Sequence, residues 1–199
     1  MEQEKTIILN QLNKMLETKT FSDPVKEKIN YVVSKAYDSY SKKEDKRKFF
    51  EQLISSLSSV NEFRISTRKQ LNKRENIASI LPDCSLGVTV MDKSLVAVAK
   101  EGNEERTIYH EMIHLTQSAN SYYFTGNYPF QTLVTLCLRE GEASYYDSDL
   151  KKDTDGNKIE ILSLSNGEEL GLESKNSYPF FSMVYESLID IFGEEIMTK

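Results

Sequence analysis

The two histidines of the sequence, His110 and His114, are four residues apart and give the strongest chemical signal in the chain. Glu111 follows the first of them, so the three residues fit the pattern His-Glu-x-x-His. Side chains four positions apart lie on one face of a helix, and both imidazoles can then reach one metal ion. A glutamate placed just after the first ligand lies beside the ion, where its carboxylate can take a proton from activated water. The pattern predicts a zinc (Zn2+) site with Glu111 as general base.

Two histidines can also share a helix face by chance, as in a helical interaction protein where the spacing has no chemical meaning. The chain has only two histidines among its 199 residues. The probability that they fall four apart with a glutamate after the first is on the order of one in a thousand, given ordinary glutamate frequency. Coincidence is therefore a weak explanation of the motif.

A third ligand is needed, because a catalytic zinc takes three protein ligands and leaves one position open for water. No further histidine exists, so this ligand must be a carboxylate. Residues 139–145 (Arg-Glu-Gly-Glu-Ala-Ser-Tyr) lie on the next expected helix, which can return and present one carboxylate to the ion. Glu140 and Glu142 are about 200° apart around a helix, so only one of them can face the metal.

His-Glu-x-x-His followed by Glu-Gly-x-Ala-x-Tyr at 140–145 resembles the gluzincin metallopeptidases, in particular their aminopeptidase-N-like and clostridial-collagenase-like members. In those two groups the zinc glutamate immediately precedes this glycine. The resemblance therefore implies Glu140 as the third ligand beside His110 and His114, with Glu142 as the alternative. It also implies zinc as the cofactor and hydrolysis of a peptide bond in a peptide or protein substrate.

The segment 178–195 begins with Tyr-Pro-Phe and ends with Gly-Glu-Glu. It resembles a helix of the aminopeptidase-N-like enzymes that a tyrosine opens, and that tyrosine donates a hydrogen bond to the oxyanion. By this resemblance Tyr178 is the oxyanion stabiliser. The alternatives are Tyr145, Tyr146 and Tyr185, of which Tyr185 has apolar neighbours at helical spacing and is expected in the core.

The chain also departs from the families that it resembles. The amine-anchoring Gly-x-Met-Glu-Asn stretch of the aminopeptidases is absent, which favours an endopeptidase. The thermolysin pattern Asn-Glu-x-x-x-Asp is absent as well, because Ser144 stands four residues after Glu140. We name Asp147, one helical face further on, as the carboxylate that orients a histidine. The departures leave a second hypothesis, a catalytically inactive or latent zincin-fold module for binding or regulation.

The N-terminal part of the chain predicts helices without chemistry. Residues 1–60 carry apolar residues at helical spacing, and Ser22-Asp23-Pro24 is a helix start with a capping residue and a proline in the first turn. The basic run 42–48 is interrupted by acidic residues, which is typical of a solvated helix start. We expect residues 1–80 to form a helical region that serves as a scaffold, a partner surface or a lid.

Residues 81–199 are expected to form the zincin-like metallopeptidase core. The β-prone runs 86–90 and 95–99 predict a hairpin, and we expect the strand 95–99 to pair with an extended substrate. The other expected elements are a His-bearing helix capped by Asn103 and ending near 121, a helix from about 130 to 147, a hairpin at 159–172 with an Asn-Gly turn, and a last helix from Pro179 to about Gly193. The predicted fold class is α+β: zincin-like, mostly helical, with a small antiparallel sheet next to the active-site helix.

Composition limits the partners. The net charge is −6, so no nucleic acid is expected. No apolar run approaches the roughly 20 residues of a membrane span, and the N-terminus lacks the features of a signal peptide. We expect a soluble chain, either cytoplasmic or excised from a longer secreted or anchored protein. Cys84 and Cys137 do not make a disulfide framework, and Cys137 is expected to be a buried free thiol.

Overall fold

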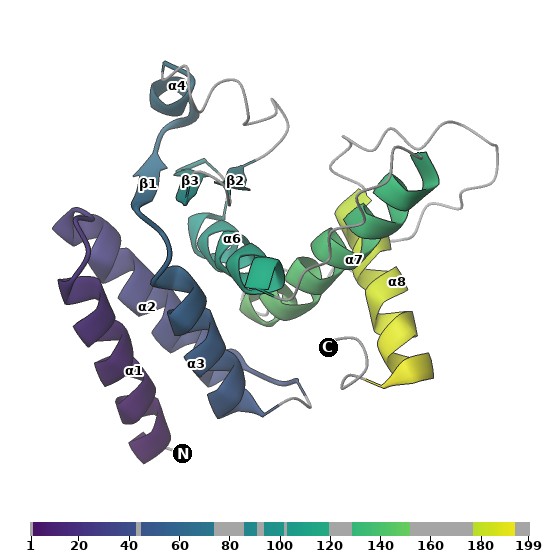
Figure 1. Ribbon diagram of the computed structural model, residues 1–199, viewed down its shortest axis with the longest axis horizontal. Helices are drawn as coiled ribbons and strands as arrows, with labels where there is room; N and C mark the ends of the chain where they lie inside the picture. Colours follow the sequence, from purple (N-terminus) through teal and green to yellow (C-terminus); the bar gives the residue numbers. More distant parts are fainter. Residues whose placement is uncertain are drawn as a thin grey trace.

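The computed structural model describes most of the chain as helices around a small sheet (Figure 1). The described residues are 2–42, 45–73, 86–90, 94–101, 103–119, 129–151 and 177–193. Within these ranges the side chains of residues 118–119, 129–137, 149, 151 and 177–182 are not described. The predicted hairpin at 159–172, Cys84 and the side chain of Cys137 therefore lie outside the described part.

Three N-terminal helices lie together at the lower left of Figure 1: α1 (Glu2–Glu17), α2 (Asp23–Ser39) and α3 (Lys46–Leu57). The predicted proline start of α2 is confirmed, since Pro24 lies in its first turn. Asp45 caps α3 by accepting a hydrogen bond from the backbone N–H of Lys48 at 3.1 Å. Each helix buries an apolar stripe at the helical period, as at Ile8, Leu12 and Leu16 of α1. The helices predicted for residues 1–60 are thus confirmed.

The sheet has three strands among the described residues, in the order β1 (Glu62–Ser66), β3 (Leu95–Ala99), β2 (Gly87–Val90). β2 and β3 form the predicted antiparallel hairpin. β1 pairs parallel to β3, so the sheet is mixed, and the expectation of an antiparallel sheet was wrong. The five residues of β1, Glu-Phe-Arg-Ile-Ser, alternate between polar and apolar, which is a strand signal that the sequence analysis did not use.

The arrangement of the sheet also overturns the expected substrate strand. β3 is the central strand and is paired on both sides, with β1 along one edge and β2 along the other. All five of its residues are buried. Its backbone groups are therefore engaged within the sheet, and β3 cannot add a substrate strand.

The remaining helices are α4 (Arg68–Leu71), α6 (Glu104–Ala119), α7 (Pro129–Asp147) and α8 (Ser177–Phe192), with a 3-10 turn η1 (Ser148–Lys151) after α7. Asn103 caps α6 as predicted, because its Oδ1 accepts from the N–H of Arg106 at 3.1 Å. Gly193 ends α8 with φ 82°, and its N–H donates to the carbonyl of Ile189 at 2.8 Å. The three C-terminal helices therefore agree with the predicted ones to within a few residues.

α6 lies at the centre of the molecule and packs against α2, α3, α7 and the strands β2 and β3 (Figure 1). One cluster of buried apolar side chains runs from α1–α3 through β1 and β3 to α6 and α7. The ring of Tyr146 on α7 stacks on that of Phe49 on α3, with centroids 4.5 Å apart. The predicted regions 1–80 and 81–199 therefore share a core, and the boundary proposed between them falls in residues 74–85, outside the described part.

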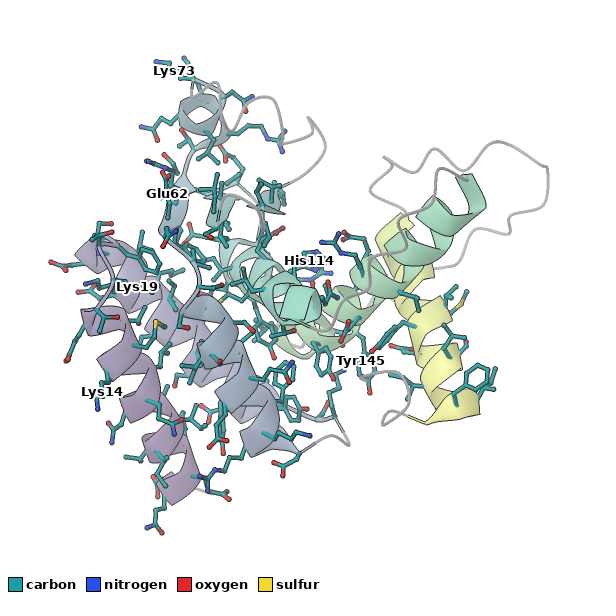
Figure 2. The ribbon with its side chains drawn as sticks, viewed as in Figure 1. Lys14, Lys19, Glu62, Lys73, His114 and Tyr145 are labelled. Atoms are coloured by element: carbon teal, nitrogen blue, oxygen red, sulfur yellow. The ribbon has the colours of Figure 1, made fainter. Side chains whose placement is uncertain are left out.

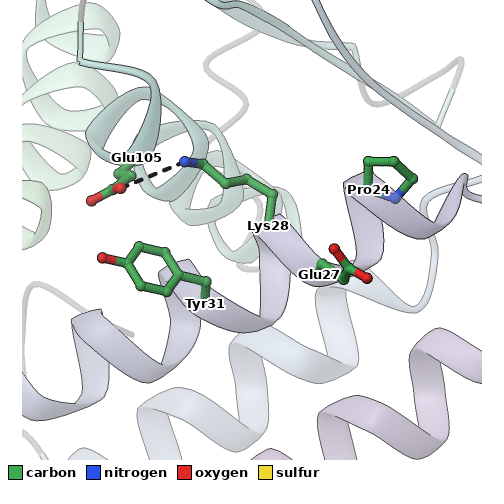
Figure 3. A pocket seen from close by; sticks show the side chains of 5 residues that line it. All are labelled: Pro24, Glu27, Lys28, Tyr31 and Glu105. Carbon is green, nitrogen blue, oxygen red and sulfur yellow. Dashed lines mark hydrogen bonds and ion pairs between the residues drawn. The ribbon is translucent and has the colours of Figure 1, made fainter.

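Ion pairs join α2 to the first turn of α6. Lys28 Nζ lies 3.2 Å from Glu104 and 3.5 Å from Glu105, and Lys35 Nζ lies 3.1 Å from Glu105. Figure 3 shows Lys28 and Glu105 at a surface hollow that Pro24, Glu27 and Tyr31 also line. These side chains are partly exposed, so each pair contributes at most about 1 kcal/mol. These ion pairs therefore contribute little to holding α6, the helix that carries the histidines, in place.

The described residues thus form an α+β fold with seven α-helices and a small mixed sheet. Among those helices, none combines the length and hydropathy that a membrane span requires.

Candidate metal centre

His110 and His114 project from one face of α6 toward α7, as their spacing predicts. Figure 2 shows His114 between these two helices. Both side chains are buried, and their Nε2 atoms lie 3.2 Å apart. The two rings are nearly perpendicular, at 87°, with centroids 4.8 Å apart. The face of α6 that is opposite its apolar contacts with α3 therefore presents two imidazole nitrogens to one point.

Glu140 on α7 faces the same point. Its Oε2 lies 3.3 Å from Nε2 of His110, and its Oε1 lies 3.5 Å from Nε2 of His114. Glu142 does not join them, because its Oε2 accepts a hydrogen bond from the amide of Gln117 at 2.9 Å. The structure thus brings Glu140, the residue that the resemblance implied, to the two histidines.

The outer nitrogen of each imidazole has its own acceptor. Nδ1 of His110 lies 2.9 Å from Oδ2 of Asp147, and Nδ1 of His114 lies 2.7 Å from Oε1 of Gln117. An acceptor at this position keeps the proton on Nδ1 and leaves the lone pair on Nε2 free for a metal ion. Asp147, which the sequence analysis named for this task, contacts His110 directly.

These donor atoms fit a zinc ion. Ligand atoms at about 2.0–2.1 Å from a tetrahedral zinc lie about 3.3–3.4 Å from one another. The two Nε2 atoms lie 3.2 Å apart, and Glu140 places Oε2 3.3 Å from that of His110 and Oε1 3.5 Å from that of His114. With one ligand atom from each side chain, all three atoms lie within 4.8 Å of one another, and among the described residues these three side chains form the group that could hold a metal. Two imidazoles and one carboxylate are also a ligand set that zinc takes in hydrolytic enzymes. Lone pairs that converge in this way repel one another unless a cation lies between them.

The electrostatics of the cluster favour positive charge at this point. Burial works against protonation of His110, but the Asp147 and Glu140 carboxylates outweigh it and raise the pKa of His110 to about 10. Burial also opposes protonation of His114, and Glu140 outweighs it and raises the pKa of that imidazole. Burial raises the pKa of the Glu140 carboxyl group. The charges and hydrogen bonds of the two histidines outweigh burial and hold this pKa well below the ordinary range. The negative charge of the Asp147 and Glu140 carboxylates can stabilise either a proton or a metal ion at the histidines.

Glu111, the expected general base, lies on the side of α6 that faces β2. Oγ1 of Thr89 on β2 lies 2.7 Å from Oε2 of Glu111 and 2.9 Å from its backbone carbonyl. A Cβ at position 87 would lie 2.5 Å from Oε1 of Glu111, so a glycine at Gly87 lets β2 approach this carboxylate. Burial raises the pKa of Glu111, although the charges of His114 and His110 act to lower it.

Arg106 adds a second contact to Asp147. Its Nε lies 3.0 Å from Oδ2 of Asp147, the same oxygen that faces His110. Asp147 is only 1% exposed, so a buried carboxylate here needs a cation beside it. Arg106 stands one helical turn before His110 on α6, and the two side chains hold Asp147 between them.

Sequence reasoning missed Thr89, Arg106 and Gln117. A signal existed for two of them, because Arg106 precedes His110 by four residues and Gln117 follows His114 by three, which places each on the ligand face of the helix. Thr89 had no such signal. Its contact with Glu111 depends on how β2 lies against α6.

The tyrosines divide into three cases. Tyr178 lies in the first turn of α8, and its side chain is outside the described part, so its role as oxyanion stabiliser stays a prediction. Tyr185 is buried, as expected for a core residue, and Tyr146 is buried against Phe49. Tyr145 is partly buried, and Nζ of Lys42 lies 3.8 Å from the centre of its ring.

The chain was also compared with known proteins. None of the protein families, curated proteins or solved structures compared with it matches. The chemistry of this centre therefore has to be argued from its own geometry.

Proposed function

We propose that this chain is a zinc metallopeptidase with a zincin-like core of the gluzincin type, acting as an endopeptidase on peptides or proteins. One observation carries the proposal. Nε2 of His110, Nε2 of His114 and the Glu140 carboxylate converge within 3.5 Å of one another, and each imidazole has a separate acceptor at Nδ1. His110, His114 and Glu140 would hold the zinc. When bound, the ion would supply a Lewis acid that polarises the substrate carbonyl and makes water acidic.

Glu111 would act as general base. It would accept the proton of the attacking water and later return it to the leaving amine. Its burial raises the pKa of the carboxyl group above that of an exposed glutamate, which makes it a stronger proton acceptor. Thr89 would hold the carboxylate in place through the hydrogen bond at Oε2. Tyr178 would stabilise the oxyanion, by the resemblance on which it was named.

The substrate backbone would lie along β2. β3 has a neighbour on each side, whereas β1 and β2 are the edge strands of the sheet among the described residues. β2 is also the strand whose Thr89 touches Glu111. A peptide added to this edge would therefore pass beside the proposed base. The absence of the aminopeptidase amine-anchoring stretch from the sequence supports internal cleavage.

Replacing the base tests the proposal. Glu111→Gln keeps the shape of the side chain but removes its proton acceptor, so we expect zinc binding to persist and hydrolysis of a peptide library to fall by about 100-fold or more. Glu105→Gln makes the same chemical change on the same helix, at a residue that pairs with Lys28 and Lys35 instead. This control should cleave like the wild type. Zinc content by elemental analysis and product formation by mass spectrometry are the two measurements.

The alternative is an inactive or latent zincin-fold module. The absence of the thermolysin-type acid from the sequence was one reason to consider it, whereas the contact between Asp147 and His110 supplies a carboxylate to one histidine and favours the enzyme. A wild-type chain that binds zinc and cleaves nothing in the library would favour the module. A Glu111→Gln variant as active as the wild type would rule out Glu111 as the base.

A further inference from the structure

We propose that Gln117 is a positioning residue for the metal centre, which fixes the tautomer of His114 and ties it to the chain segment that carries Glu140. The inference rests on the proposed function, since it assumes that His114 binds a metal. It concerns residues that neither the motif nor the resemblance assigns. It is carried by the three hydrogen bonds of one buried amide.

The Gln117 amide lies between α6 and α7. Its Oε1 lies 2.7 Å from Nδ1 of His114, and its Nε2 donates to the carbonyl of Arg139 at 2.7 Å and to Oε2 of Glu142 at 2.9 Å. The side chain is 3% exposed, and Glu142 is 7% exposed. An amide buried to this degree keeps the partners that the protein supplies.

The partners of Nε2 settle which end of the amide faces His114. A backbone carbonyl and a carboxylate are both acceptors, so only the NH2 end of Gln117 can point at Arg139 and Glu142. The oxygen end must then face Nδ1 of His114, which has to donate. The tautomer of His114 with its lone pair on Nε2 is therefore selected by two groups on α7 acting through Gln117.

The same amide connects two of the proposed ligands. Arg139, whose carbonyl it binds, is the residue immediately before Glu140. Gln117 therefore holds the backbone of α7 beside the third ligand while it orients the second. His110 is held differently, by the carboxylate of Asp147, which also lies 3.0 Å from Arg106. Losing Gln117 should loosen His114 and Glu140 together and leave His110 in place.

Gln117→Met tests this role, because methionine has a similar length and neither accepts nor donates as the amide does. We expect its dissociation constant for Zn2+, measured by competition with a chromophoric chelator at fixed pH, to rise by about 10- to 100-fold. Gln11→Met is the matched control, since Gln11 is exposed on α1. It should bind zinc like the wild type. Thermal unfolding of the metal-free proteins reports whether Gln117→Met changes stability instead of metal affinity.

A paired substitution gives a rescue that a purely structural role would not show. Gln117→Glu keeps the acceptor for His114 but sets a second carboxylate against Glu142, so we expect weaker zinc binding. Adding Glu142→Gln restores a donor facing an acceptor between positions 117 and 142, whereas the carboxylate at 117 still faces the Arg139 carbonyl, so the double variant should regain part of the lost affinity. If Gln117→Met does not fold, the zinc affinities of Gln117→Glu and of the double variant still test the role of Gln117.

Cobalt-loaded protein supplies a spectroscopic signature. Each cobalt-bound imidazole has one Nδ1 proton, whose nuclear magnetic resonance is shifted well away from the other signals and is lost when the proton exchanges quickly with water. The wild type should show two such protons. Gln117→Met should keep that of His110, which Asp147 holds, and lose that of His114.

The outcomes separate this inference from the proposed function. Wild-type protein that binds neither zinc nor cobalt would overturn both. Protein that binds metal but shows equal affinity in Gln117→Met, or no recovery in the double variant, would overturn the role of Gln117 alone. Weakened binding with recovery in the double variant supports it, whatever the peptidase assay shows.

Discussion

The N-terminal helices and the interface between α6 and α7 are both buried, but they are held together by different forces. The interior of α1–α3 is made of apolar side chains such as Ile8, Leu53 and Phe50. The buried polar and charged side chains of the described part lie instead on α6 and α7: His110, Glu111, His114, Thr116, Gln117, Glu142, Ser144 and Asp147. Apolar attraction has no preferred direction, whereas a buried polar group needs a partner at hydrogen-bond distance and costs about 1–3 kcal/mol when it loses that partner.

This difference separates side chains that stabilise the fold by apolar burial from side chains that could hold a metal ion. A domain of this size gains stability more readily from apolar side chains than from buried ion pairs, whose desolvation often cancels their attraction. The concentration of carboxylates and imidazoles on two facing helices therefore indicates a site. The comparison can be tested by substitutions in each region, measured for both free energy of unfolding and metal affinity.

The largest effect is expected in the apolar region. Phe50 is fully buried against Tyr37 and Phe49, so Phe50→Ala should lower the free energy of unfolding by about 3–5 kcal/mol. Denaturant titration of the metal-free protein measures this loss, while zinc affinity of the folded fraction should not change. Phe192→Ala removes a ring that is 53% exposed and should alter stability by less than about 0.5 kcal/mol. Comparable losses in both variants would contradict the assigned core.

The next effect separates the two glutamates of α7. Zinc sites of four ligands are worth about 10–16 kcal/mol, so one ligand contributes about 2.5–4 kcal/mol, or roughly 100- to 1,000-fold in affinity. Glu140→Ala should lose that much, because its carboxylate faces both histidines. Glu142→Ala should lose less, since Glu142 reaches the centre only through Gln117. The reverse order of the two affinities, measured by chelator competition, would make Glu142 the ligand.

A smaller effect is expected at the carboxylate behind His110. Asp147→Asn keeps an oxygen that can accept from Nδ1 but removes the charge that Arg106 also contacts. Zinc affinity should fall by about 10- to 100-fold. Ser148, the next residue along the chain, supplies the control Ser148→Ala, which changes a partly buried hydroxyl in the 3-10 turn. An Asp147→Asn variant that binds zinc as tightly as the wild type would mean that this carboxylate does not act on the metal.

The smallest effect is expected at the surface between α2 and α6. Lys28→Met removes the ion pair with Glu105, which Figure 3 shows, and the ion pair with Glu104, while retaining an apolar stem. The free energy of unfolding should fall by about 0.2–1 kcal/mol at low salt, and the difference should shrink as salt is added. Peptidase activity should be unchanged. A loss as large as that of Phe50→Ala would show that this contact, and not apolar packing, holds α6 in place.

Much of the helical framework was predictable from local patterns. The proline start of α2, the Asn103 cap of α6 and the glycine after α8 each depend on residues within one turn of the helix end. The pairing of the strand β1 was not, because its five alternating residues do not show that it lies parallel to β3, some 30 residues further along the chain. The role expected for β3 failed for the same reason: a hairpin in the sequence does not show what lies on its other edge.

By itself the sequence determined that His110 and His114 share a face, because a helix repeats every 3.6 residues and the pair is separated by four. The sequence named Glu140, Glu142 and Asp147 of α7 as candidates, and the tertiary structure decided among them. Glu140 rather than Glu142 faces the imidazoles, and Asp147 takes the outer nitrogen of His110, because the contact between α6 and α7 presents one face of each helix to the other. Gln117, on α6 itself, takes the outer nitrogen of His114. Helical periodicity is local, whereas the choice of facing residues depends on how two helices pack, and no short stretch of sequence contains that information.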